Sequence, residues 1–294
     1  MGRIASVLHW DATTVNPTLP IRVLITGGAG NVGGWLARTA PVGVALHVTE
    51  HRTPVPAEVA ALATVHHVDL VDADAVQRLF VTARPDVVVH TAYVQAQRTA
   101  IVDATRNVAV GAAQVGATMV HLSTDVVFSG DEPPYGEEDP LDPTTDYGRW
   151  KADAEAAVRS AVPDVCITRT SMVVSIEPLD RVTASLATAL VRCEPVKLFD
   201  DEMRQPIRAE DLASELWTLV GLDRRESAGV WHLPGPERLD RFTLGVRLAA
   251  RLGLDASAVT VARAADVAPE RPRDPELVSD RRVQLGVRLR PVDA

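Results

Sequence analysis

Tyr147 and Lys151 stand four residues apart, forming a Tyr-x-x-x-Lys pair that can move a proton during hydride transfer. Four residues make about one helical turn, so both side chains project from one face of a helix. A phenol with a pKa of about 10 is a poor acid or base at neutral pH unless a nearby cation stabilises its phenolate. We expect Lys151 to supply that cation and to hydrogen-bond a nicotinamide ribose. The alternative is a surface tyrosine with a solvated lysine on an amphipathic helix.

A hydroxyl group precedes this pair along the chain. The apolar run 117–124 ends in Ser123-Thr124, followed by Asp125. The carboxyl end of a strand in a parallel sheet borders the crevice where ligands bind. We therefore expect Thr124 to hold the oxygen atom of a substrate.

A glycine-rich loop lies near the start of the chain. Gly27, Gly30 and Gly33 follow the apolar run 21–26 with the spacing G-x-x-G-x-x-G. Glycines let the backbone approach a pyrophosphate, and the free N–H groups of the following helix bind anions. This position, between a strand and a helix, predicts dinucleotide binding by the glycines together with Asn31 and Val32. A merely tight turn is the alternative.

The segment Glu50-His51-Arg52 follows the second apolar run and should lie at the adenosine end of the cofactor. An acidic residue there favours NAD, whereas an arginine accepts the 2′-phosphate of NADP. Arg52, with His51 beside it, favours NADP(H) over NAD(H), unless the segment is only a solvated charge cluster. Asp69, before Leu70, is placed to accept a hydrogen bond from the adenine amino group. It could equally be a turn or N-cap residue.

Apolar runs alternate with helical patterns along the first 170 residues. The run IRVLIT stops at glycines, which is typical of a strand buried on both faces. The expected strands are 21–26, 44–50, 63–69, 85–92, 117–124 and 164–170, and the expected helices are 31–40, 72–85 (ending before Pro85), 99–115 and 146–161. The alternation predicts βαβ units and a Rossmann-type, doubly wound parallel α/β sheet.

The pattern becomes less regular after residue 170. We expect helices at 181–193, 210–221 and 241–254, a short strand at 229–235 and an extended, proline-rich tail at 269–276. The expected division has an N-terminal extension (1–20), an NAD(P)-binding domain (21–171 and 206–232) and a smaller α/β substrate-binding lobe (172–205 and 233–294). The active site should lie in the cleft between the domain and the lobe.

The composition excludes several classes of protein. With 294 residues, 46% hydrophobic and 23% charged, the chain has a globular composition. The net charge of −9 argues against nucleic acid or an anionic membrane surface as the main partner. There is neither an apolar run of the ~18 residues that a membrane span needs nor a secretory signal. The two cysteines have no metal-binding or disulfide spacing, and no metal site is expected, which fits a reducing, cytoplasmic setting.

Several stretches resemble the extended short-chain dehydrogenases/reductases over residues 21–290, and within them the dTDP-4-dehydrorhamnose reductase family. The matching stretches are RVLITGGAGNVGGWLA, PDVVVHTAY, STDVVFSGDEPPYGEEDPLDPTTDYGRWKADAE, RQPIRAEDLASEL, GVWHLPGPERLDRFTLGVRLAARLGL and PERPRDPEL. The methionine adenosyltransferase regulatory β subunit shares many of these motifs. The segment 123–155 is the most specific of them.

The resemblance implies a role for further residues. Thr124, Tyr147 and Lys151 correspond to the catalytic groups of the family. Asn107 corresponds to a helix asparagine whose backbone helps to hold a water near the lysine, although such a residue is often structural. Tyr93, after Ala92, lies beside the nicotinamide, unless it is a half-buried aromatic residue. The substrate side corresponds to Asp125, Val126, Arg169, Ser171 and Gln205. The resemblance also suggests a homodimer.

Two departures from the family pattern fall near the expected sugar pocket. The reductases usually have tyrosine where this chain has Val126, and tryptophan where it has Met172. Val126 also replaces the glutamate that a 4,6-dehydratase would use as a second acid–base group, which argues against dehydration. The machinery for hydride transfer therefore looks complete while the substrate pocket is altered.

Three functions compete at this point. The first is an NAD(P)H-dependent reductase that acts on a keto group of a nucleotide-activated deoxysugar. The second is a sugar-nucleotide epimerase of the same superfamily, which would hold NAD⁺ tightly. The third is a regulatory subunit that binds NADP and a partner enzyme without turnover.

Overall fold

The computed structural model describes residues 20–294, so the expected extension 1–20 lies almost wholly outside it. Seven of the described strands form one parallel sheet in the order β11-β6-β5-β4-β1-β2-β3. They are β1 (Ile21–Thr26), β2 (Val44–Glu50), β3 (Thr64–His67), β4 (Val87–His90), β5 (Thr118–Thr124), β6 (Cys166–Thr170) and β11 (Gly229–His232). The order reverses between β1 and β4, as in a Rossmann-type doubly wound sheet, so the predicted fold class is confirmed.

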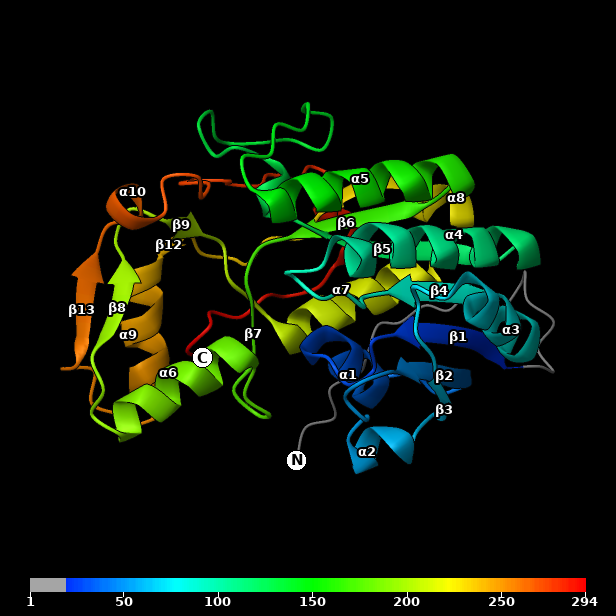
Figure 1. Ribbon diagram of the computed structural model, residues 1–294, viewed down its shortest axis with the longest axis horizontal. Coiled ribbons are helices and arrows are strands. Elements are labelled where there is room, and N and C mark those ends of the chain that lie inside the picture. The colour runs from blue at the N-terminus through cyan, green and yellow to red at the C-terminus, as the bar shows by residue number, and fades with distance from the viewer. Residues whose placement is uncertain (1–19) are drawn as a thin grey trace.

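Helices cover both faces of this sheet (Figure 1). One face carries α1 (Asn31–Arg38), α2 (Ala57–Ala60) and α7 (Ala209–Gly221). The other carries α3 (Ala73–Ala83), α4 (Ala104–Val115) and α5 (Asp146–Ala161). A π-helical turn η1 (Thr99–Asp103) leads into α4, a short 3₁₀ turn η2 (Asp125–Val127) follows β5, and α8 (Arg224–Ser227) and η3 (Arg282–Leu285) lie near the sheet's β11 side.

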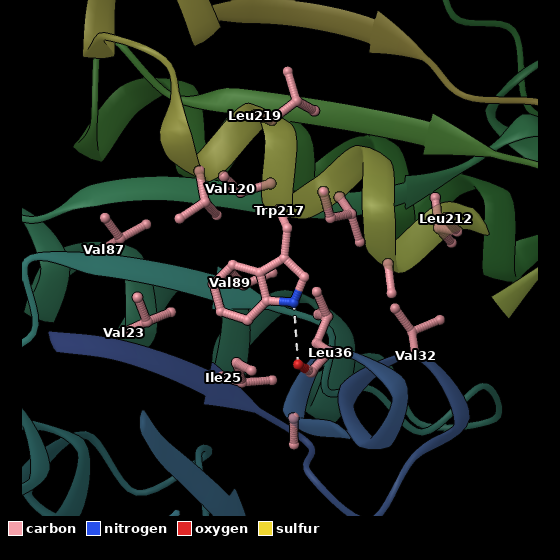
Figure 2. Packing of buried hydrophobic residues seen from close by; sticks show 14 of the residues in the cluster. Val23, Ile25, Val32, Leu36, Val87, Val89, Val120, Leu212, Trp217 and Leu219 are labelled. Carbon is pink, nitrogen blue, oxygen red and sulfur yellow. Dashed lines mark hydrogen bonds between the residues drawn. The ribbon is translucent and has the colours of Figure 1, made fainter. Parts of the chain in front are cut away.

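The strands are apolar throughout because successive side chains enter two different cores. Val23 and Ile25 of β1 pack on the α1–α7 side, whereas Leu24 packs on the α3–α5 side. Figure 2 shows the first of these cores, where the indole nitrogen of Trp217 donates a hydrogen bond to Leu36 O at 3.1 Å. This bond connects α7 to α1, so a helix from the second half of the chain packs directly against the first helix.

A second group of elements lies beyond β6 and after β11 (Figure 1). Helices α6 (Arg181–Val191) and α9 (Arg241–Arg251) pack with a two-stranded parallel sheet made of β8 (Val196–Phe199) and β13 (Val259–Ala262). Smaller pairs are β7 (Val173–Val174) with β10 (Ile207–Arg208) and β9 (Met203–Arg204) with β12 (Leu239–Asp240), and α10 (Ala264–Val267) follows β13. The division into domains stays a prediction.

The expected elements differ from the observed ones mainly at their ends. The helix expected at 146–161 is observed with those bounds, and Thr145 caps it by accepting a hydrogen bond from Gly148 N. The pattern did not predict α2, β8 or β13. No helix within residues 20–294 is both long enough and apolar enough to cross a membrane.

Candidate active site

A cleft of about 1050 Å³ runs along the carboxyl ends of the sheet strands and reaches the α6–α9 group. Most of the predicted site residues line it: Gly27, Gly30, Asn31, Val32, Gly33, Arg52, Asp69, Leu70, Ala92, Tyr93, Thr124, Asp125, Val126, Tyr147, Lys151 and Ser171. Strands of a parallel sheet end on the same edge, which is why residues so far apart in sequence meet there.

The glycine loop leaves no room for side chains. A Cβ atom on Gly33 would lie 2.3 Å from Gly27 O, and one on Gly27 would lie 3.0 Å from the Cα of Ala92. Gly27 also has a φ of 78°, which disfavours other residues. Helix α1 begins after Gly30 with no side-chain cap, so its first N–H groups remain available for an anion. The loop fits the pyrophosphate of a dinucleotide.

Glu50 and Arg52, at the end of the cleft where the adenosine is expected, have different surroundings. Glu50 accepts a hydrogen bond from Val55 N at 2.8 Å and is 3.7 Å from His67, so its carboxylate is turned to the protein. Arg52 is exposed to the cleft, and no carboxylate of residues 20–294 lies within ion-pair distance of it. Asp69 accepts a hydrogen bond from Val71 N at 3.0 Å, in keeping with the turn alternative, while still lining the cleft.

Tyr147, Thr124 and Lys151 meet in the middle of the cleft. Helix α5 presents Tyr147 and Lys151, and Thr124 ends β5. The ring of Tyr93 lies 5.9 Å from that of Tyr147 and 5.7 Å from Lys151 Nζ. The arrangement can place a phenol, a hydroxyl and an ammonium group around one carbonyl oxygen.

Burial shifts the pKa values of two members of this group in opposite directions. Burial raises the pKa of Tyr147 well above its usual value, with Tyr93 and Asp125 adding to the effect and the Thr124 hydroxyl opposing it. Tyr147 is therefore a neutral phenol, the form that can donate a proton. Burial lowers the pKa of Lys151 to about 8, and its Nζ donates a hydrogen bond to Leu122 O at 2.7 Å. The lowering of the phenol pKa by Lys151 stays a prediction.

Asp125 follows β5 and Ser171 follows β6, and a hydrogen bond connects these two side chains. Ser171 Oγ donates a hydrogen bond to Asp125 Oδ2 at 2.6 Å, and burial raises the pKa of that carboxyl. Val126 and Met172, the two departures from the family pattern, both line the cleft here. The Sδ of Met172 contacts the guanidinium of Arg241. Met172 therefore lies next to a positively charged side chain that lines the same cleft.

Three of the predicted site residues do not line the cleft. The guanidinium of Arg169 is 2% exposed and makes a bidentate ion pair with Glu155. The side-chain amide of Gln205 is hydrogen-bonded to the backbone of Leu277. Its Nε2 donates to Leu277 O at 3.2 Å, and its Oε1 accepts from Leu277 N at 2.8 Å. The Asn107 amide donates to Leu70 O and Val71 O, each at 3.0 Å.

Internal partners satisfy these three side chains, so Arg169 and Gln205 do not line the cleft as predicted. The side chain of Asn107 joins α4 to the loop after β3, so the structural alternative describes it. A water near its backbone stays a prediction.

The sequence analysis missed a group of charged residues at the far end of the cleft. Glu202 is fully buried, accepts two hydrogen bonds from Arg271 at 2.7 and 2.8 Å, and lies 3.1 Å from Arg204. Arg241 also lines the cleft, but no carboxylate of the described chain lies within 4.0 Å of its guanidinium. Arg271 belongs to the proline-rich tail 269–276. No local pattern in this tail predicts that it lines the cleft.

The fold and this cleft define a Rossmann-type protein with the site arrangement of an extended short-chain dehydrogenase/reductase. More particularly, the chain belongs to the RmlD substrate binding domain family, whose model matches residues 21–291. The family resemblance drawn from the motifs is thereby confirmed.

The individual relatives include proteins of different function. The chain is 36% identical over 138 residues to a dTDP-4-dehydrorhamnose reductase of Sinorhizobium fredii, covering 45% of this chain and 46% of the relative. It is 27% identical over 236 residues to the methionine adenosyltransferase 2 subunit beta of Bos taurus, covering 75% and 71%. A dTDP-4-dehydrorhamnose reductase structure from Bacillus anthracis, in complex with NADP, has a TM-score of 0.76 at 20% identity, covering 93% and 95%.

Proposed function

We propose that the protein is an NADPH-dependent reductase of a keto group on a nucleotide-activated deoxysugar. The observation that carries this proposal is the continuity of the cleft, which joins the glycine loop, Tyr147 and the arginines beyond Met172. Its volume of about 1050 Å³ exceeds that of most single-ligand pockets and suits a dinucleotide and a second large ligand together. The named reductase relatives support this substrate class.

The chain's own residues would divide the chemistry among them. NADPH, when bound against the glycine loop, supplies the hydride. Tyr147, held neutral by burial, donates its proton to the oxygen of the carbonyl being reduced. Thr124 orients that oxygen, and Lys151 would bind the cofactor ribose through the ammonium protons that its hydrogen bond to Leu122 O does not use. Reduction consumes the proton of the neutral phenol, and the raised pKa keeps Tyr147 in that protonated form.

The arginines favour an anionic substrate. Glu202 is hydrogen-bonded by Arg271 and lies 3.1 Å from Arg204, whereas no carboxylate of the described residues lies within 4.0 Å of the Arg241 guanidinium. Glu202 and Asp180 act on Arg241 only from a greater distance, so this half-buried cation would be stabilised by an anion bound beside it. The diphosphate of a nucleotide sugar would supply that anion.

Arg52 should decide the choice of cofactor. We expect Arg52→Ser to weaken NADPH binding about tenfold or more and to change NADH binding little, because one charge-assisted phosphate contact is lost. Fluorescence titration of both cofactors measures the effect. Arg78→Ser, at an exposed position of α3 away from the cleft, is the matched control. Equal weakening of both cofactors would remove the role assigned to Arg52.

A direct assay of NADPH oxidation tests the proposed function. Purified protein is incubated with NADPH and a panel of dTDP-, UDP- and GDP-activated 4-keto deoxysugars, and absorbance at the nicotinamide band is followed. We expect substrate-dependent oxidation of NADPH with at least one of them. Protein that carries NAD⁺ through purification and interconverts sugars without net oxidation would instead be the predicted epimerase.

A regulatory subunit is the second candidate, and the similarity to methionine adenosyltransferase 2 subunit beta favours it. Such a protein would bind NADPH at this cleft and a synthetase partner elsewhere. Binding of NADPH without turnover of any nucleotide sugar, together with co-purification of an adenosyltransferase, would favour this function over the reductase.

A further inference from the structure

A buried carboxylate lies one helical turn after Lys151. Glu155 is 1% exposed, and its Oε1 accepts hydrogen bonds from Ser123 Oγ at 2.6 Å and from Arg169 Nε at 3.1 Å. Its Oε2 accepts a third from Arg169 Nη2 at 2.9 Å. A buried carboxylate is costly unless it is paired and hydrogen-bonded, and Glu155 meets both conditions. It is therefore a fixed negative charge inside the protein.

This carboxylate joins three elements of the active site. Ser123 immediately precedes Thr124 on β5, and Arg169 lies opposite Ser123 in the register of β5 and β6. Lys151 and Glu155 occupy one face of α5, four residues apart. Lys151 contacts Leu122 O and Glu155 contacts the next residue, Ser123, so α5 is attached to β5 at two consecutive positions.

We propose that Glu155 is a positioning residue for Lys151: held by Ser123 and Arg169, its carboxylate docks α5 on β5 and keeps the Lys151 ammonium charged inside the protein. The inference rests on the proposed function only for the use of Lys151 as the cation that binds the cofactor. Arg169 acts on Lys151 only through Glu155, whose carboxylate it stabilises.

The electrostatic surroundings of Lys151 agree with this role. Burial lowers its pKa, and the carboxylate of Glu155 is the charge that raises it. Three other titratable groups facing Lys151 are neutral near pH 7. They are His90 on β4 and His121 on β5, whose pKa values burial lowers, and Tyr147 on α5, whose pKa burial raises. The ring of Tyr93, after β4, lies 5.7 Å from Lys151 Nζ.

The remaining charges nearby contact Glu155 or one another. Arg159, four residues further along α5, lies 3.8 Å from Glu155 Oε2. Arg169 contacts His232 Nε2 of β11 at 3.2 Å, behind Glu155. Arg98 pairs with Asp153 on the outer side of α5 and with Asp103 of η1, at 3.8 and 4.0 Å. None of these carboxylates can replace Glu155 beside Lys151, because their partners hold them on the outer side.

The scarcity of lysine makes the charge of Lys151 directly measurable. The chain has two lysines, Lys151 and Lys197, so protein labelled with ¹³C,¹⁵N-lysine gives two side-chain Nζ/Cε signals, assigned with Lys151→Met. Titration of the free protein by NMR gives the pKa of Lys151, about 8 in the wild type. We expect Glu155→Gln to lower that midpoint by about one pH unit or more, because an opposite charge has been removed.

Two further variants separate this role from general stability. Glu155→Gln leaves the buried charge of Arg169 without its carboxylate partner. If the single variant does not fold, the double variant Glu155→Gln/Arg169→Met removes both charges of the pair. The matched control is Glu215→Gln on the opposite face of the sheet. Glu215 is also 1% exposed and accepts two hydrogen bonds from one arginine, Arg282, at 2.6 and 2.9 Å.

The outcomes differ between a positioning role and a purely structural one. We expect Glu215→Gln to lower stability without moving the Lys151 midpoint, and Lys197 to titrate alike in all variants. The loss of NADPH affinity with rising pH should begin about one pH unit lower in Glu155→Gln than in the wild type. An unchanged Lys151 midpoint in folded Glu155→Gln, or an equal change in Glu215→Gln, would overturn the proposal. The NMR readout needs no substrate, so absence of reductase activity would count against the proposed function alone.

Discussion

Replacing Tyr147 with phenylalanine should lower kcat for NADPH-dependent reduction about 10²–10⁴-fold, because general acid catalysis contributes factors of this size. The ring remains, so packing against Tyr93 is kept while the proton donor is lost. The dissociation constant of NADPH should stay within about twofold of the wild type, since the phenol oxygen makes no contact that the glycine loop needs. Steady-state kinetics and cofactor titration on the same preparation measure both quantities.

Tyr93→Phe is the comparison that makes this result specific. Tyr93 is half exposed and lies beside Tyr147, so it tests whether any phenol in this part of the cleft can donate the proton. We expect a much smaller loss than in Tyr147→Phe. If the two variants lose similar activity, or if Tyr147→Phe retains wild-type turnover, another acid protonates the product and the assigned mechanism is wrong.

Local signals were sufficient for the large sheet and for the middle of the site. The run 21–26 is apolar on both faces because its side chains enter two cores, and this is visible without any partner. Tyr147 and Lys151 could be paired from spacing alone, because a helix places residues four apart on one face. Thr124 joined them because the ends of parallel strands share an edge.

The residues that the sequence did not place correctly depend on distant partners. Whether Arg169 faces the cleft is decided by Glu155 on another element, and the amide of Gln205 is held by Leu277, far along the chain. The strands β8 and β13 are short and pair across about sixty intervening residues, so neither has a local pattern of its own.

Acidification should destabilise the protein well before its carboxylates are protonated. His90, His121 and His232 are fully buried, and burial lowers the pKa of His90 to about 3, that of His232 to about 4 and that of His121 well below its usual value. The unfolded chain binds a proton at each histidine below a pH of about 6.5, and the native state does not. Stability is therefore complete above that pH and falls as the pH is lowered towards the native pKa values.

The loss should be large compared with the stability of a typical domain. Each histidine contributes about 1 kcal/mol between pH 6.5 and 5.5, so the free energy of unfolding should fall by about 3 kcal/mol over that interval. Urea unfolding followed by tryptophan fluorescence at several pH values measures the slope. Paired carboxylates with lowered pKa values contribute mainly below a pH of about 4.5. The raised pKa values of Asp125 and Glu215 oppose the histidines from the acid side, so the window from 6.5 to 5 reports mainly the histidines.

His121→Leu should remove at most about one third of this slope without loss of stability at pH 7, because His47 and His66, whose pKa values burial also lowers, add to the slope. Neither ring nitrogen of His121 has a hydrogen-bond partner within residues 20–294, and its ring stacks on His90 at 5.5 Å. An apolar side chain of similar size therefore removes a desolvation cost and breaks no bond in the described chain. His67→Asn, at an exposed position of β3, is the control and should leave the slope unchanged. A slope unaltered by His121→Leu would mean that His121 accepts a proton in the native state, and the depressed pKa assigned to it would be wrong.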